Sequence, residues 1–143
     1  MKEKLIGRKI VSFKSMAFYI DGFLKSELIA LFAKTGDGIW YKFSISEGKA
    51  SIRLQEHEPT STIEIIDGNK FEYPVKDLFL DIDYSESEVS NIQEYLWNGQ
   101  KSESCGWLLS FRNNNEISFL DDDDSLIIIK GKSIDSLANC ILD

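Results

Sequence analysis

Four consecutive carboxylates, Asp121 to Asp124, are the feature of this sequence with the clearest chemical potential. They stand between two strongly apolar runs, so we expect them at the tip of a hairpin. Because neighbouring like charges repel, folding alone gives no reason to gather four of them, whereas a cationic partner would. The run therefore predicts either a docking surface for a basic protein or a solvated tip that prevents edge-to-edge aggregation.

A divalent cation is another partner that an aspartate cluster could bind, since Ca²⁺ and Mg²⁺ prefer oxygen ligands. Ca²⁺ loops, however, space their ligands at alternate positions and carry a glycine at the sharp turn, and Asp121 to Asp124 do neither. His57 is the only histidine, and a histidine-rich zinc site needs more than one. We therefore predict no bound metal.

Catalytic chemistry has weaker candidates. Asp81 and Asp83 would share one face of a strand and could pair as acid and base, although an acidic loop leading into a helix explains them better. Cys105 could act as a nucleophile with His57 as its base, but nothing in the sequence brings the two together. The glycines within 36–38 suit a turn between strands, not a phosphate-binding loop. The sequence predicts no enzyme and no cofactor.

The charge is unevenly distributed along the chain. Residues 1–60 carry ten Lys and Arg against seven Asp and Glu, whereas residues 61–143 carry six against seventeen. The net charge of −8 would repel nucleic acid, which needs a basic patch. No stretch approaches the ~20 apolar residues of a membrane-spanning helix. We therefore expect a basic protein as the partner, and neither nucleic acid nor a membrane.

The predicted docking surface combines carboxylates with apolar anchors. Complementary charge raises the association rate and the specificity, and buried aromatic side chains supply affinity. The carboxylates come from the acidic run and from the start of a predicted helix, and the anchors come from that helix. The predicted partner-binding residues are Asp121, Asp122, Asp123, Asp124, Asp81, Asp83, Glu86, Glu88, Tyr95 and Trp97.

Alternating apolar residues predict a β-rich first half. A chain of 143 residues is the size of one domain, so residues 1–143 are predicted to form a single domain. Residues 27–55 are predicted as a three-stranded meander whose strands are joined by glycine-containing turns. A shorter hairpin is expected over 63–73, and a further strand over 75–83.

The second half adds a predicted helix. Apolar residues recur at helical spacing over 85–98, where Ser85 and Glu88 fit a capping box. Residues 107–130 form a second predicted meander, and 133–142 fit a short C-terminal helix. The expected fold is mainly β, of the α+β class, with two antiparallel meanders packed as a sandwich or a half-open barrel. Either an internal duplication or generic β patterning explains the similarity of the two meanders.

Cys105 and Cys140 carry no C-x-x-C spacing. Two reduced thiols in a cytosolic protein are the simpler interpretation, and a disulfide is the alternative. The first residues are positively charged but contain no apolar run of signal-peptide length, so we expect a cytoplasmic protein. The oligomeric state is left open.

The whole chain resembles, at the level of class, the small acidic immunity proteins that accompany bacterial toxins. The features that carry the resemblance are the acidic half after residue 60, the run Asp121 to Asp124, the aromatic-rich β framework and the lack of a catalytic motif. The resemblance implies a non-enzymatic protein that neutralises a basic nuclease toxin by covering its active site.

Two other roles are compatible with the sequence. A β-barrel module could hold a small apolar or sugar-like ligand in a cavity lined by Trp40, Tyr41 or Trp107. A structural subunit would instead bury a large apolar patch in a homo-oligomer.

Overall fold

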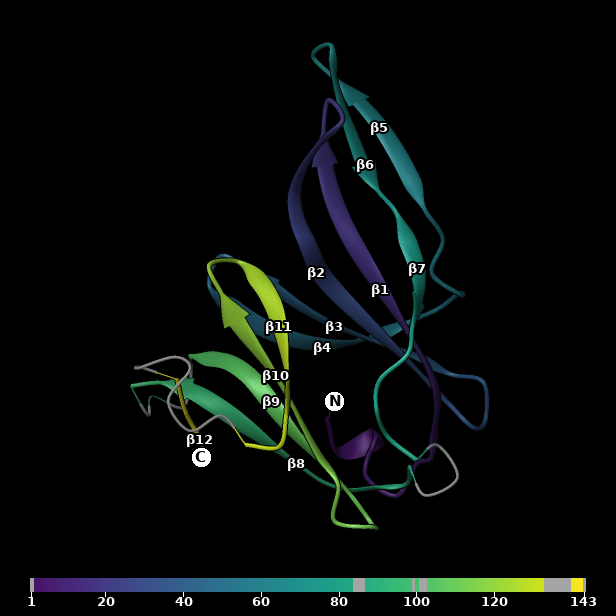
Figure 1. Cartoon of the computed structure of the whole chain (residues 1–143), viewed down its shortest axis with the longest axis vertical. Coiled ribbons are helices and arrows are strands. Elements are labelled where there is room, and N and C mark those ends of the chain that lie inside the picture. Colours follow the sequence, from purple (N-terminus) through teal and green to yellow (C-terminus); the bar gives the residue numbers. More distant parts are fainter. Residues whose placement is uncertain (1, 84–86, 99, 101–102, 133–139, 143) are drawn as a thin grey trace.

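Strands dominate the protein. The computed structural model describes residues 2–83, 87–98, 100, 103–132 and 140–142. The only helical turn among them is the 3₁₀ turn η1 (Lys2–Lys4). Within these residues the strands form two antiparallel sheets, one of them curved into a half-barrel (Figure 1). The predicted mainly β fold is therefore confirmed.

The larger sheet is built on two long strands, β1 and β2. Its described strands are β1 (Ile10–Ile20), β2 (Phe23–Thr35), β3 (Trp40–Ser46), β4 (Lys49–Gln55), β5 (Thr62–Ile66), β6 (Asn69–Tyr73) and β7 (Val75–Leu78). They follow the order β4-β3-β2-β1-β6-β5, and β7 also pairs with β1. β1 thus has partners along both edges, with β2 on one side and β7 and then β6 on the other.

The smaller sheet is formed by the second half of the chain. Its described strands are β8 (Val89–Trp97), β9 (Ser104–Phe111), β10 (Glu116–Asp122), β11 (Ser125–Lys130) and β12 (Cys140–Leu142). They follow the order β11-β10-β9-β8-β12. The two predicted meanders are therefore present, as β2–β4 in one sheet and β9–β11 in the other.

Short turns in the larger sheet follow from residues that accept positive φ. Between β1 and β2, Asp21 has a φ of 48° and Gly22 a φ of 83°. Two successive positive values define the type I′ turn, whose twist matches that of the strands it connects. The sequence therefore determines locally where this hairpin closes.

The helix predicted over 85–98 is wrong, because 89–97 forms strand β8. Val89 and Ile92 both reach the core although they lie three positions apart, a spacing that also fits a helix. The register of β8 with β9 shifts between Val89 and Asn91. This bulge places an extra residue between the two inward-facing side chains. The bulged strand thus has the apolar spacing of a helix.

The predicted C-terminal helix falls partly outside the described residues, which leave out 133–139. Where the chain is described again, Cys140–Leu142 forms β12, with Cys140 opposite Trp97 of β8. Among the described residues, no helix has the length and apolar character needed to cross a membrane.

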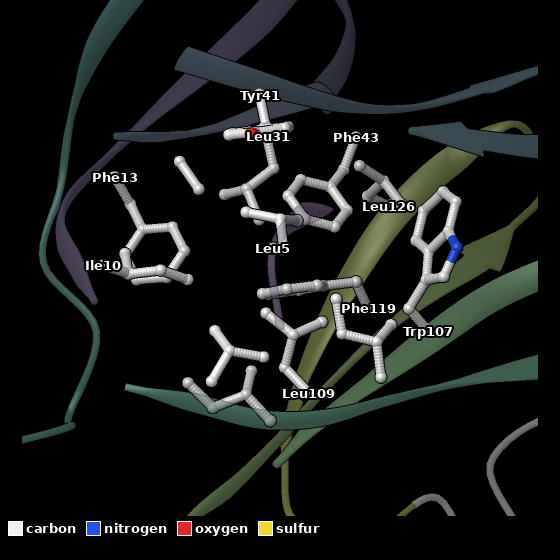
Figure 2. Packing of buried hydrophobic residues seen from close by; sticks show 14 of the residues in the cluster. Leu5, Ile10, Phe13, Leu31, Tyr41, Phe43, Trp107, Leu109, Phe119 and Leu126 are labelled. Carbon is white, nitrogen blue, oxygen red and sulfur yellow. The ribbon is translucent and has the colours of Figure 1, made fainter. Parts of the chain in front are cut away.

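The core lies between the two sheets (Figure 2). Phe43 of the larger sheet packs edge-on against Trp107 of the smaller one, with ring centroids 5.3 Å apart. Leu5, which follows η1, is fully buried in the same cluster. The next residues join the smaller sheet, because the Gly7 N–H donates to the carbonyl of Val89 at 2.8 Å. Burial of these large side chains is the main favourable contribution that holds the sheets together.

Candidate docking surface at the acidic hairpin tip

The acidic run lies at the tip of the β10–β11 hairpin. Asp122 and Ser125 are the last paired residues, and Asp123 and Asp124 form the two-residue turn between them. Both turn residues have positive φ, 55° and 61°, as a type I′ turn requires. Aspartate tolerates this conformation because its short polar side chain can hydrogen-bond locally. Folding therefore gives a reason for two of the four aspartates, contrary to the expectation from charge repulsion alone.

Asp121 points inward. Only 4% of this residue is exposed, and its Oδ1 accepts the backbone N–H of Asp124 at 2.9 Å. Burial raises the pKa of the Asp121 carboxyl, the hydrogen bond from Asp124 opposes that shift, and the charges of the three following aspartates add to it. Although Asp121 was predicted as a docking residue, its side chain serves the turn.

Asp124 joins the tip to the other sheet. Its Oδ1 accepts the backbone N–H of Gly48, in the β3–β4 turn, at 3.1 Å. The carbonyl of Gly48 accepts the indole N–H of Trp97 at 2.9 Å. Beside these bonds, the hydroxyls of Ser26 and Ser125 lie 2.6 Å apart. The acidic turn is thus fixed against the larger sheet.

Four carboxylates are exposed at this end of the molecule: Glu47, which precedes Gly48, and Asp122, Asp123 and Asp124. We call these four residues the acidic tip. None of them forms an ion pair within the part of the chain that the structure describes. Unpaired carboxylates gathered in this way produce a negative potential that attracts cationic groups.

The other predicted carboxylates lie apart from the acidic tip. Asp81 pairs with Lys130 at 3.2 Å, at the end of β11 that is opposite the tip. Glu88 forms an ion pair of 2.9 Å beside the β9–β10 turn. Asp83 is exposed, and Glu86 lies outside the described residues. At ~3.3 Å per residue, the length of β11 separates Asp81 from the acidic tip, so the two do not form one surface.

The aromatic residues predicted as anchors have structural contacts. Tyr95 is fully buried, and its hydroxyl lies 2.7 Å from Ser118 Oγ. Trp97 is half-buried, and its indole N–H donates a hydrogen bond to the carbonyl of Gly48. A fully buried tyrosine has no surface to offer a partner, so Tyr95 belongs to the core of the smaller sheet.

The residues suggested as the lining of a ligand cavity are also packed. Trp40, Tyr41 and Trp107 are 5%, 2% and 2% exposed. Trp107 borders a hollow of about 180 Å³ together with Lys2 and Glu94. These two residues form an ion pair of 3.1 Å, so the hollow is not the closed apolar cavity that was considered.

The candidates for catalysis are not brought together. β7 ends at Leu78, so Asp81 and Asp83 lie beyond the strand that was predicted to align them. His57 is exposed in an irregular segment. Cys105 is fully buried and takes part in a disulfide, so the simpler interpretation of a reduced thiol is wrong. Within the described residues, no group of three His, Cys, Asp or Glu side chains could hold a metal ion.

One surface that the sequence analysis missed is an uncovered apolar strand. Every residue of β5 is exposed, including Ile63 at 60% and Ile65 at 69%. Phe23, at the start of β2, is 71% exposed. Figure 1 shows β5, β6 and the β1–β2 turn extending beyond the smaller sheet. The alternation of Ile63 and Ile65 with Glu64 predicted a strand but not that its apolar side would be left open.

Comparison of the chain with protein-family models, with curated proteins and with solved structures found no match. The function is therefore argued from the arrangement of its own residues.

Proposed function

We propose that this chain is a non-enzymatic binding protein that docks its acidic tip onto a basic partner. The observation that carries the proposal is the acidic tip, whose four exposed carboxylates lack ion-pair partners among the described residues. The bond between Asp124 and Gly48 fixes this charge in place. Charges that need no rearrangement on encounter raise the association rate for a partner of opposite sign.

Under this proposal the partner is a basic protein, and the resemblance to immunity proteins suggests a nuclease toxin domain as an example. A cytoplasmic address is part of the same proposal. The disulfide of Cys105 weighs against that address, since disulfides persist mainly in oxidising compartments.

The proposal is tested by removing the charge of the acidic tip without changing its shape. The variant carries Glu47→Gln, Asp122→Asn, Asp123→Asn and Asp124→Asn, in which the new amide at 124 keeps an acceptor for Gly48. A matched control neutralises four exposed carboxylates elsewhere: Glu56→Gln, Glu58→Gln, Asp77→Asn and Asp81→Asn.

Association with a panel of basic proteins, nuclease domains among them, is measured at low and high salt. We expect the tip variant to associate about tenfold more slowly at low salt and to lose most of its salt dependence, because screened charge acts chiefly on the on-rate. The control should retain both. If the two variants have equal association rates and equal salt dependence, the acidic tip is not the docking surface.

The outer strand β5 favours a second candidate role, that of a subunit in a homo-oligomer. An edge strand offers unpaired backbone groups, and Ile63 and Ile65 add exposed apolar surface to it. Light scattering over a range of concentrations tests this role, with the double variant Ile63→Lys, Ile65→Lys for comparison. A dimer that the double variant dissociates supports the candidate, and a wild-type monomer at every concentration excludes it.

A further inference from the structure

A hollow of about 330 Å³ opens on the inner face of the larger sheet, and the residues that line it come from β1, β2 and β7. Ser15 of β1 pairs with Leu31, a core residue, on one side and with Lys76 of β7 on the other. Residues that oppose one another in antiparallel strands share a face, so Ser15 continues the face that forms the core. In Figure 1, β1 and β2 run on past the smaller sheet. The hollow lies where that sheet no longer covers them.

The walls of the hollow are partly apolar and partly fixed by the core. Leu24 and Leu28 of β2, Leu78 of β7 and Tyr19 of β1 line it. Leu28 and Leu78 also pack against the main core cluster. Small-molecule sites typically combine such apolar walls with a few polar groups in defined positions.

A buried hydroxyl borders the hollow. Ser15 is 3% exposed, and its Oγ has no hydrogen-bond partner among the described residues. Buried polar atoms are rarely left unpaired, because they lose their hydrogen bonds to water without replacement. An atom bound in the hollow can supply the missing partner, since Ser15 lines it.

Two opposite charges complete the lining. Glu27 comes from β2 and Lys76 from β7, and both are exposed. Neither forms an ion pair with another residue in the described parts of the chain. Beside its apolar surface, the hollow therefore presents one carboxylate and one ammonium group that have no ion-pair partner among the residues the structure describes.

We infer that this hollow binds a small zwitterion with an apolar side group, the chemistry of a branched-chain amino acid such as leucine. The ammonium group of the ligand faces Glu27, its carboxylate faces Lys76 and accepts from the Ser15 hydroxyl, and its side group lies on the leucine walls. A ligand with a single charge meets a like charge from one of the two residues. An uncharged apolar ligand leaves Ser15 unpaired. The inference does not rest on the acidic tip.

Nuclear magnetic resonance titration of the isotope-labelled protein tests the inference with four probes. Leucine is compared with isocaproate, which lacks the ammonium group, with isoamylamine, which lacks the carboxylate, and with glycine, which lacks the apolar side group. We expect leucine to bind about tenfold more tightly than any of the other three, because each loses one set of contacts. The perturbed amides should belong to β1, β2 and β7.

Variants assign the contacts. Glu27→Gln should weaken the binding of leucine about tenfold but not that of isocaproate, which Glu27 repels. Lys76→Gln should weaken the binding of leucine equally but not that of isoamylamine, which Lys76 repels. Glu64→Gln, which removes an exposed charge of the same sheet outside the hollow, serves as the control. Ser15→Ala should also weaken the binding of leucine. If this variant fails to fold, the two charge variants alone test the inference. Absence of leucine binding at millimolar concentration, equal affinity for all four probes, or charge variants that behave like the control would each overturn the inference.

Discussion

The backbone N–H of Gly48 donates a hydrogen bond to the Oδ1 of Asp124 at 3.1 Å, although the two residues lie 76 positions apart in the sequence. Each residue belongs to a tight hairpin turn, and the two turns come from different sheets. The side chain of a turn residue thus links the ends of two hairpins. Asp124 both adopts positive φ and accepts a hydrogen bond from the other sheet. Substitutions can therefore distinguish its contribution to stability from that of the neighbouring aspartates.

Replacing Asp124 by alanine should lower the free energy of unfolding by about 1–3 kcal/mol. Alanine tolerates positive φ poorly and offers no acceptor to Gly48. Asp124→Asn keeps both properties and should remain close to the wild type. Urea denaturation measures the difference, with Asp122→Ala as the control, since Asp122 is exposed and extended. If the two alanine variants are equally stable, the link between the turns contributes nothing.

Gly106→Ala should destabilise the protein by about 3 kcal/mol or more, at the upper end of overpacking effects. Gly106 has a φ of 154°, and a Cβ placed there would lie 2.1 Å from the carbonyl oxygen of Phe119. Backbone cannot move aside as a flexible side chain can. Gly68→Ala is the matched control, because Gly68 also has positive φ (80°) but open space around it. We expect the control to cost about 1 kcal/mol, and similar losses in the two variants would contradict the steric argument.

The stability of the protein should depend on the charge of Asp121 in a defined direction. The pKa of this carboxyl is raised above its ordinary value of 3.8, chiefly by burial, so the folded state binds its proton more tightly than the unfolded state does. Stability contributed by the protonated form is therefore present at low pH and lost as the pH rises through the folded-state pKa.

Asp121→Asn isolates this effect, because the amide stays neutral and can still accept from Asp124. The variant should gain stability relative to the wild type as the pH rises from about 4 to 7, measured by urea denaturation at each pH. A difference that does not change with pH would show that the carboxyl titrates alike in the folded and unfolded chains.

Reduction should destabilise the protein by about 2–4 kcal/mol. Cys105 is a disulfide cysteine that is fully buried in the core of the smaller sheet, so breaking its bond frees an otherwise closed loop. Thermal melts with and without a strong reductant measure the effect, and Cys105→Ala should melt like the reduced wild type and no longer respond to the reductant. Identical melting of the wild type under both conditions would mean that the bond does not constrain the fold.

The elements that could be predicted from the sequence are those whose pattern is local. The meander over 27–55 was recognisable because Tyr41, Phe43 and Ile45 alternate with polar residues such as Lys42 and Ser44. The strand does bury the face that carries the three apolar side chains. The region 89–97 was mistaken for a helix because its bulge depends on pairing with β9, which follows it in the chain. A bulge changes the spacing of the apolar residues, and here no characteristic residue type in the sequence marks its position.

The same distinction applies to the candidate site. The position of the acidic run at a hairpin tip could be predicted from its flanking strands. The inward orientation of Asp121 and the burial of Tyr95 could not, because they depend on the turn geometry and on Ser118, a residue of another strand. The Ser15 hydroxyl, which has no hydrogen-bond partner among the described residues, was hidden for a related reason, since the pairing of β1 with β2 and β7 shows which face it shares.

The central position of β1 has a consequence for how the chain folds. In the sequence β1 precedes every strand it pairs with, and its second edge is completed only by β6 and β7, which come much later. Closing so long a loop before the contacts form makes folding slow. Until then, the β1–β2 hairpin presents a long unpaired edge to any other chain nearby. The risk that two chains associate through this edge is therefore greatest early in folding, before residues 69–78 have paired with β1.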